Sequence, residues 1–179
     1  MDHDSYSDSY IAGILQTAKS FAMVGASANP VRPSYFVLKY LIAKGYRVFP
    51  VNPGQAGGEI AGQKVFAKLS DLEEPADVID IFRNSQAALG IVRDALALKD
   101  KLGLKVIWMQ LGVRNDEAAA LAESAGLKVV MNRCPKIEYG RLSGEIGWVG
   151  VNNRLISSQK PVMLGKGYQQ LSIRPAKPS

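Results

Sequence analysis

The residues best suited to bind a ligand follow the first predicted strand of the chain. Gly25, Ala26 and Ser27 form a loop of small residues, and Arg32 and Ser34 stand where the next helix is expected to begin. Small side chains let a ligand approach the backbone closely. Free backbone N–H groups and the positive helix end attract phosphate, and Arg32 adds a guanidinium fork that fits phosphate oxygens. We therefore predict a ligand site here, with Ser34 capping the helix.

The composition is that of one globular domain. The chain has 179 residues, 47% of them hydrophobic and 21% charged, which is enough for a substantial core. No apolar run reaches the ~20 residues that a membrane span needs. The acidic start, Met1 to Ser5, is unlike a secretory signal, so a cytoplasmic protein is expected. The net charge of +6 comes from scattered residues, although a basic tail at 160–177 leaves nucleic-acid binding as a minor alternative.

Apolar periodicity and turn residues predict strands that alternate with helices. This rhythm is typical of a doubly wound, mostly parallel α/β sheet with helices on both faces, a Rossmann-like fold. Pro50 predicts that the second strand lies near an edge, and the segment after it lacks the usual crossover helix. The predicted strands are 20–24, 46–51, 76–82, 105–110 and 127–131, and the predicted helices are 9–19, 34–44, 84–101 and 115–126.

The alternation stops near Gly144. We therefore divide the chain into a ligand-binding domain at 1–143, which includes the leading helix, and a C-terminal extension at 144–179. The composition of the final residues predicts that the end of this extension is disordered.

The first loop departs from the fingerprint of NAD-binding proteins. That fingerprint is G-x-G-x-x-G with an acidic residue closing the second strand, whereas here Gly25 opens a loop without further glycines and Asn52 follows the second strand. The missing acid removes repulsion against a phosphorylated ribose, which favours NADP or coenzyme A over NAD. The phosphate-binding pattern of ATPases is absent as well. An NADP-dependent oxidoreductase is the alternative to a CoA-binding protein.

Several ordered motifs together resemble the family of CoA-binding domains related to that of the alpha subunit of succinyl-CoA synthetase. The resemblance covers roughly residues 15–142. Its motifs are Val24-Gly25-Ala26-Ser27, Asn29-Pro30-x-Arg32-Pro33-Ser34, Pro50-Val51-Asn52-Pro53, Val78-Ile79-Asp80-Ile81-Phe82-Arg83, Trp108-Met109-Gln110-Leu111-Gly112 and Asn132-Arg133-Cys134-Pro135-Lys136.

This resemblance implies a Rossmann-type fold that binds coenzyme A across the strand ends. The first loop would cradle the phosphates. Asn52 and Pro53 would lie by the adenosine ribose, and Phe82 and Arg83 would flank the adenine or its phosphates. The residues implied for the pantetheine arm and its thiol end are Gln110, Leu111, Gly112, Asn132 and Cys134.

No catalytic constellation stands out. The one histidine, His3, lies near the N-terminus, and no His/Cys cluster has metal-ligand spacing. Cys134 is the one cysteine. A free cysteine is usually a buried small hydrophobe. The alternative hypothesis is that the neighbouring Arg133 and Lys136 lower the thiol pKa and that the thiol forms a mixed disulfide with CoA under oxidation.

We therefore read the chain as a stand-alone protein that binds CoA or acyl-CoA without evident catalysis. A carrier, a sensor or a module that presents acyl-CoA to a partner would each fit. A homo-oligomer or a protein partner is compatible with the sequence.

Overall fold

The computed structural model describes residues 2–145. Apart from Gly144 and Glu145, the predicted C-terminal extension lies outside the described residues, as does the disorder predicted for its end. In chain order, the elements are α1 (Asp8–Thr17), β1 (Ser20–Val24), α2 (Pro33–Ala43), β2 (Arg47–Val51), η1 (Pro53–Gln55), β3 (Glu59–Ile60), β4 (Gln63–Lys64), η2 (Leu69–Asp71), β5 (Val78–Ile81), α3 (Ser85–Ala97), α4 (Lys99–Leu102), β6 (Val106–Met109), α5 (Asp116–Ser124), β7 (Lys128–Val130) and α6 (Pro135–Leu142).

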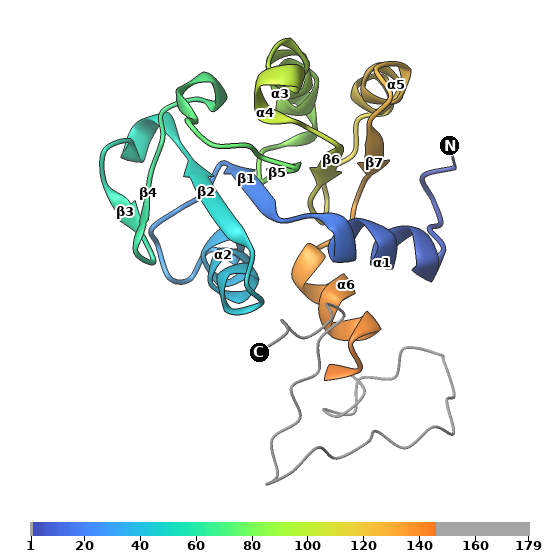
Figure 1. The fold of residues 1–179 in the computed structure, drawn as a ribbon, viewed down its shortest axis with the longest axis horizontal. Coiled ribbons are helices and arrows are strands. Elements are labelled where there is room, and N and C mark those ends of the chain that lie inside the picture. The colour runs from blue at the N-terminus through green and yellow to red at the C-terminus, as the bar shows by residue number, and fades with distance from the viewer. Residues whose placement is uncertain (1, 146–179) are drawn as a thin grey trace, which may run out of the picture.

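Five parallel strands form the central sheet in the order β2-β1-β5-β6-β7. Helices α3, α4 and α5 lie on one face, and α1, α2 and α6 lie on the other (Figure 1). This arrangement confirms the predicted Rossmann-like α/β fold. After β2, the chain crosses to the opposite side of β1, so the strand order reverses between β1 and β5. A crevice at the carboxyl ends of the strands is expected at such a switch point.

Alternation along the strands builds two apolar layers. In β1, Phe21 and Met23 pack among α1, α2 and α6, whereas Ala22 packs toward α3 and α5. Residues 78–81 of β5 and 106–109 of β6 are buried throughout, as is typical of parallel strands covered on both faces. The burial of these strands makes the sheet a rigid platform for the loops at its carboxyl edge.

The connection from β2 to β5 contains no α-helix. It forms the small β3–β4 hairpin and two 3-10 turns, and Phe66 makes an isolated bridge to Val51. β2 is one of the two outer strands of the central sheet, which confirms the expectation from Pro50. One face of the sheet near β1 and β2 therefore lacks the helix that usually covers it.

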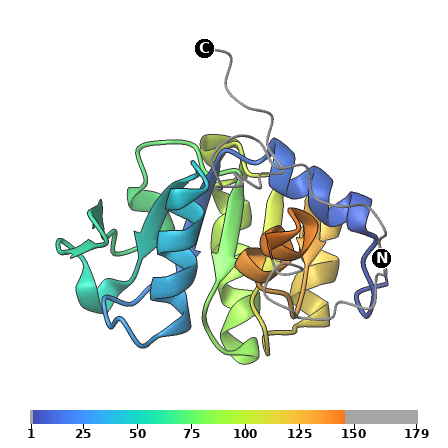
Figure 2. The ribbon, with the colours of Figure 1, turned by 90° about the horizontal axis from the view of Figure 1, so that it is seen from below.

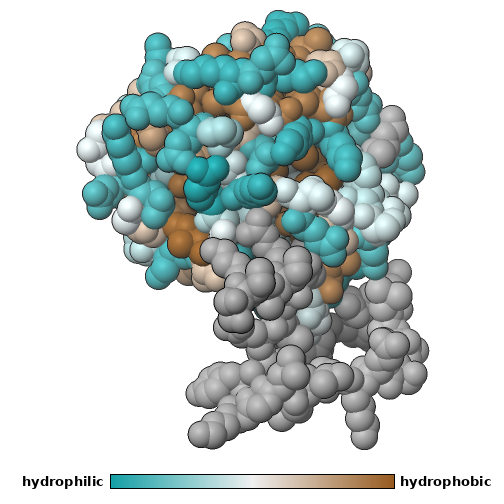
Figure 3. All heavy atoms as spheres, viewed as in Figure 1, coloured by the Kyte–Doolittle hydropathy of each residue, from teal (hydrophilic) through white to brown (hydrophobic). Residues whose placement is uncertain are grey.

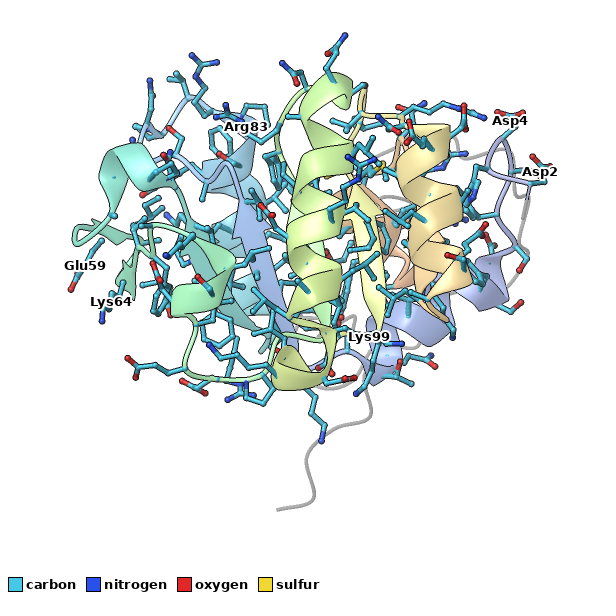
Figure 4. The ribbon with its side chains drawn as sticks, turned by 90° about the horizontal axis from the view of Figure 1, so that it is seen from above. Asp2, Asp4, Glu59, Lys64, Arg83 and Lys99 are labelled. Atoms are coloured by element: carbon cyan, nitrogen blue, oxygen red, sulfur yellow. The ribbon has the colours of Figure 1, made fainter. Side chains whose placement is uncertain are left out.

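Two tyrosine hydroxyls lie along the outer edge of β7. The Tyr10 hydroxyl accepts from the Val129 N–H and donates to its carbonyl, both at 3.1 Å. The Tyr6 hydroxyl accepts from the N–H of Met131 at 2.8 Å. Figure 4 shows the N-terminal segment with Asp2 and Asp4 on this flank, and the β3–β4 hairpin with Glu59 and Lys64 on the opposite flank.

The face that Figure 3 shows is mainly hydrophilic, and hydrophobic residues reach the surface there in separate patches. None of the helices within residues 2–145 is both long and apolar enough to cross a bilayer.

Candidate ligand site at the carboxyl edge of the sheet

A cavity of about 860 Å³ opens at the carboxyl edge of the sheet, where the loops after β1, β5, β6 and β7 meet the first turns of α2 and α6. These two helices lie on the same face of the sheet (Figure 2). Figure 4 shows Arg83 at this end of the molecule and Lys99 at the opposite end. The predicted site residues that line the cavity are Gly25, Ser27, Arg32, Ser34, Phe82, Arg83, Gln110, Leu111 and Cys134.

Gly25 is required by the backbone as well as by the cavity. Its φ is +89°, and a Cβ atom added there would lie 2.7 Å from the carbonyl oxygen of Phe82 and 2.8 Å from Cδ of Arg83. Any side chain would therefore clash with the loop after β5, in a backbone conformation that already favours glycine. The absence of a side chain lets the first loop pack directly on its neighbour.

The first loop presents unused backbone donors. Within residues 2–145, the N–H groups of Ala26 and Ser27 have no hydrogen-bond acceptor. α2 follows with Pro33 at its first position and Arg32 at the N-cap, whose side chain makes no capping hydrogen bond. The first N–H groups of a helix have no partner inside the helix. The loop and the helix end together form a region of positive potential.

Ser34 does not cap α2, so that prediction was wrong. Proline is favoured at the first helical position because its fixed φ suits a helix and its missing N–H is not needed there. The helix therefore begins at Pro33, and Ser34 lies in the first turn, buried and against the cavity.

A second helix end, which the sequence analysis missed, faces the same cavity. α6 begins at Pro135, and Cys134 at its N-cap makes no side-chain capping bond. Lys136 and Ile137 in its first turn line the cavity. The signal available in the sequence was Pro135 itself, because proline marks the first turn of many helices.

The cavity is cationic. Arg32, Arg83 and Lys136 are exposed around it, and none of them has a carboxylate partner within the described part of the chain. The Lys136 ammonium lies 5.8 Å from the centre of the Tyr40 ring. The lining includes no Asp or Glu. Three unpaired cations beside two open helix ends favour an anionic ligand.

Gln110, which lines the cavity, is hydrogen-bonded to a buried carboxyl group, that of Asp80, which does not line it. The Gln110 side-chain amide donates to the Asp80 carboxylate, with Nε2 3.1 Å from Oδ1 and 3.2 Å from Oδ2. Asp80 is fully buried, and no cation within residues 2–145 pairs with it. Burial raises the pKa of Asp80 to about 8. Because Nε2 is directed toward Asp80, the opposite side of the amide, its oxygen, is an acceptor for a ligand.

Cys134 lines the cavity, but its thiol is not activated. Cys134 is buried in the apolar layer, as expected of a free cysteine, and burial raises the pKa of its thiol above the ordinary value, so the hypothesis of a lowered pKa was wrong. The Arg133 guanidinium donates to the backbone oxygens of Asn132 and Asp4 and lies 3.9 Å from a carboxylate oxygen of Glu138. The mixed disulfide remains a prediction that this environment disfavours at neutral pH.

The remaining predicted residues shape the loops around the cavity. The Asn52 amide donates to the carbonyl oxygen of Ala26 at 2.7 Å, and its Oδ1 accepts from the Gly54 N–H at 2.9 Å. Asn132 Oδ1 accepts from the N–H of Gly112 at 2.8 Å. These bonds fix the loop after one strand to the loop after its neighbour.

Pro53 lies beside a second cavity. This smaller space, of about 430 Å³, also contacts Val24 and Val51. It lies where the crossover helix is missing, between α3 and the segment that follows β4. Ligand contacts of Ala26, Asn52, Pro53, Gly112 and Asn132 remain predictions.

Comparisons with known proteins agree on the family. Residues 19–140 match the model of the CoA binding domain family. The uncharacterized protein YneT of Bacillus subtilis is 33% identical over 129 residues, which are 72% of this chain and 91% of YneT. A solved structure from Thermus thermophilus is 38% identical, with a TM-score of 0.71, and the match covers 76% of this chain and 99% of that one.

The fold also recurs in a larger enzyme. A dinucleotide-forming acetyl-coenzyme A synthetase from Ca. Korarchaeum cryptofilum is 27% identical, with a TM-score of 0.54, over 66% of this chain and 26% of that one. The domain is thus structurally related to part of an acyl-CoA synthetase. The chain belongs to the CoA binding domain family.

Proposed function

We propose that this chain is a stand-alone, cytoplasmic protein that binds coenzyme A or acyl-CoA in the cavity at the carboxyl edge of the sheet. The supporting observation is the concentration of unpaired cations and open helix ends around one cavity. Arg32, Arg83 and Lys136 have no carboxylate partner within residues 2–145, which is the environment that phosphate groups require. The proposal includes no catalytic step.

The ligand would lie across the strand ends. Its pyrophosphate would accept hydrogen bonds from the N–H groups of Ala26 and Ser27 and face Arg32. The adenosine would extend toward Asn52 and Pro53, on the side of the second cavity. The pantetheine arm would run the other way, past Gln110, whose amide oxygen suits the N–H groups of that arm.

Calorimetric titration tests this proposal. CoA, dephospho-CoA, NAD and NADP are added to purified protein from which bound ligand has been removed. We expect micromolar binding of CoA and weaker binding of dephospho-CoA, which lacks the 3′-phosphate. Arg32→Ala should weaken CoA about 10- to 100-fold, the effect of losing hydrogen bonds to a charged group.

Arg93→Ala is the matched control. Arg93 is an exposed arginine of α3, on the other face of the sheet, where it faces Glu117. Its removal lowers the net charge equally and should leave the CoA affinity unchanged. Binding of NADP without binding of CoA would replace this proposal with the oxidoreductase alternative. An equal loss in both variants would show that total charge, and not this site, sets the affinity.

A further inference from the structure

The exposed large hydrophobic side chains of the described residues gather at one place. They are Val31, Phe36, Leu111 and Ile137, with exposed fractions of 75%, 52%, 55% and 44%. All four line the same cavity as the first loop and Arg32. We call these four residues the apolar rim. Single exposed apolar residues are common on protein surfaces, but a set that shares one cavity marks a binding surface.

We propose that the apolar rim binds the acyl chain of an acyl-CoA, so that the preferred ligand is a thioester with an apolar chain rather than free CoA. This inference rests on the proposed function, because it assumes that the CoA phosphates occupy the first loop. It adds the chemical class of the group that the cofactor carries.

The sheet order separates two residues of the apolar rim, Leu111 and Ile137, from the phosphate loop. Leu111 follows β6, which is two strands away from β1 and its loop. Neighbouring strands lie about 4.8 Å apart, so these strand ends are separated by roughly 10 Å. Ile137 follows β7, one strand further along. A ligand whose phosphates lie at Ser27 would therefore reach Leu111 and Ile137 with its distal, thiol-bearing end.

The helices place the other two rim residues at the mouth of the cavity. Val31 belongs to the loop before α2, and Phe36 lies in the first turns of that helix. α6, which carries Ile137, lies on the same face of the sheet as α2 (Figure 2). An uncharged acyl chain that extends from the thioester would contact apolar side chains near the first turns of both helices.

When free CoA binds, the side chains of the apolar rim would remain exposed to water. A thiol has no chain to cover Phe36 and Ile137, whereas each methylene of an acyl group that moves from water onto apolar side chains favours binding. The four side chains of the rim carry no charge, so the rim itself would not stabilise the terminal carboxylate of a dicarboxylic acyl group such as a succinyl chain.

The experiment is a chain-length series. Affinities of CoA, acetyl-, butyryl-, hexanoyl- and octanoyl-CoA are measured by calorimetry, with succinyl-CoA as the charged comparison. We expect the affinity to rise about two- to fourfold for each added methylene, until the chain outgrows the rim. Succinyl-CoA should bind more weakly than butyryl-CoA, which has a chain of the same length.

Phe36→Ser and Ile137→Ser should each flatten the dependence on chain length. Both side chains are exposed, so the fold should tolerate the changes, and thermal unfolding checks this. Leu121→Ser is the matched control, because Leu121 is a half-buried residue of α5 that lines neither cavity and should leave the chain-length dependence as it is.

Three results would overturn the inference. Equal affinity for CoA and every acyl-CoA would refute it while leaving CoA binding intact. A dependence on chain length that persists in both rim variants would place the chain elsewhere. A flat series together with a dimer that Phe36→Ser dissociates, seen by sedimentation, would assign the rim to self-association. If no CoA compound bound at all, the proposed function itself would fail.

Discussion

The helices that start at the carboxyl edge of the sheet begin in different ways on its two faces. On one face, α3 and α5 start under asparagine caps: Asn84 Oδ1 accepts from the Ala87 N–H at 2.9 Å, and Asn115 Oδ1 accepts from the Ala118 N–H at 2.8 Å. On the other face, Arg32 and Cys134 precede α2 and α6 without a side-chain cap. All four helices start at the same edge of the sheet, but only the uncapped pair contributes residues to the main cavity.

This difference shows that the unused hydrogen-bond donors lie at the N-termini of α2 and α6. A cap stabilises a helix by about 1 kcal/mol, so an uncapped end forgoes that stabilisation unless another acceptor arrives. At α2 and α6, the residues that replace a cap are a proline and nearby cations. We infer that the acceptor expected there belongs to a ligand.

The largest effect should come from closing one of the open helix ends. Arg32→Asp would put an acidic cap at a position whose backbone already has the extended conformation of an N-cap, with φ −82° and ψ 139°. We expect the ligand-free protein to gain about 1 kcal/mol, while the CoA affinity falls more than about 100-fold, because a cation is replaced by an anion. Denaturant unfolding and calorimetry measure the two effects.

Arg32→Ala is the comparison for that variant, since it removes the cation and adds no acceptor. It should weaken binding without the gain in stability. A gain of equal size in both variants would mean that repulsion from Arg32, and not the missing cap, weakens this helix end.

A smaller effect concerns Asp80 on the uncapped side. Its folded-state pKa of about 8 lies above the ordinary value of 3.8, so between these values the folded protein holds a proton that the unfolded chain has released. Stability therefore falls as the pH rises from about 4 to 8, by at most about 1.4 kcal/mol per pH unit. Asp80→Asn should remove this slope, so that the variant gains more stability relative to the wild type at pH 7 than at pH 4.

Urea unfolding at several pH values measures this prediction. Asp71→Asn, at an exposed site on the surface turn η2, is the control and should keep the wild-type slope. An Asp80→Asn variant that loses stability equally at pH 4 and pH 8 would show that the residue serves only through its hydrogen bond to Gln110.

The smallest effect should follow from opening a capped helix. Asn115→Ala removes the cap of α5 and should cost about 1 kcal/mol of stability, with a small further loss because its amide also donates to the carbonyl of Ser85 at 2.9 Å. CoA affinity should stay the same, because Asn115 does not line the cavity. Thermal unfolding and calorimetry test the pair of outcomes. A large loss of affinity would mean that the two faces of the sheet are coupled.

Much of the fold followed from local signals. The helices predicted at 84–101 and 115–126 start where Asn84 and Asn115 cap α3 and α5, because short polar side chains favour that position. Pro50 predicted an outer strand, because proline has no N–H to donate to a neighbouring strand and is therefore rare in strands paired on both sides. These features depend on a few adjacent residues, so they can be predicted from the sequence.

The parts that were missed depend on tertiary contacts. α6 has only 8 residues and contains Gly140, so its apolar pattern is short. Its stability comes from buried neighbours such as Tyr139, which packs edge-on against Tyr40 with ring centres 5.9 Å apart. The pKa of Cys134 was misjudged for a similar reason, because sequence neighbours reveal charge but not burial.

The tyrosines beside β7 and the bridge of Phe66 to β2 have a consequence for assembly. Parallel sheets with bare outer strands can recruit further strands from other molecules and grow into aggregates. Here, the hydroxyls of Tyr6 and Tyr10 occupy backbone groups of one outer strand, and the N–H of Asn52 and the carbonyl of Pro50 are bonded to Phe66 at the other. Copies of this protein should therefore meet through their helices and not by extending the sheet.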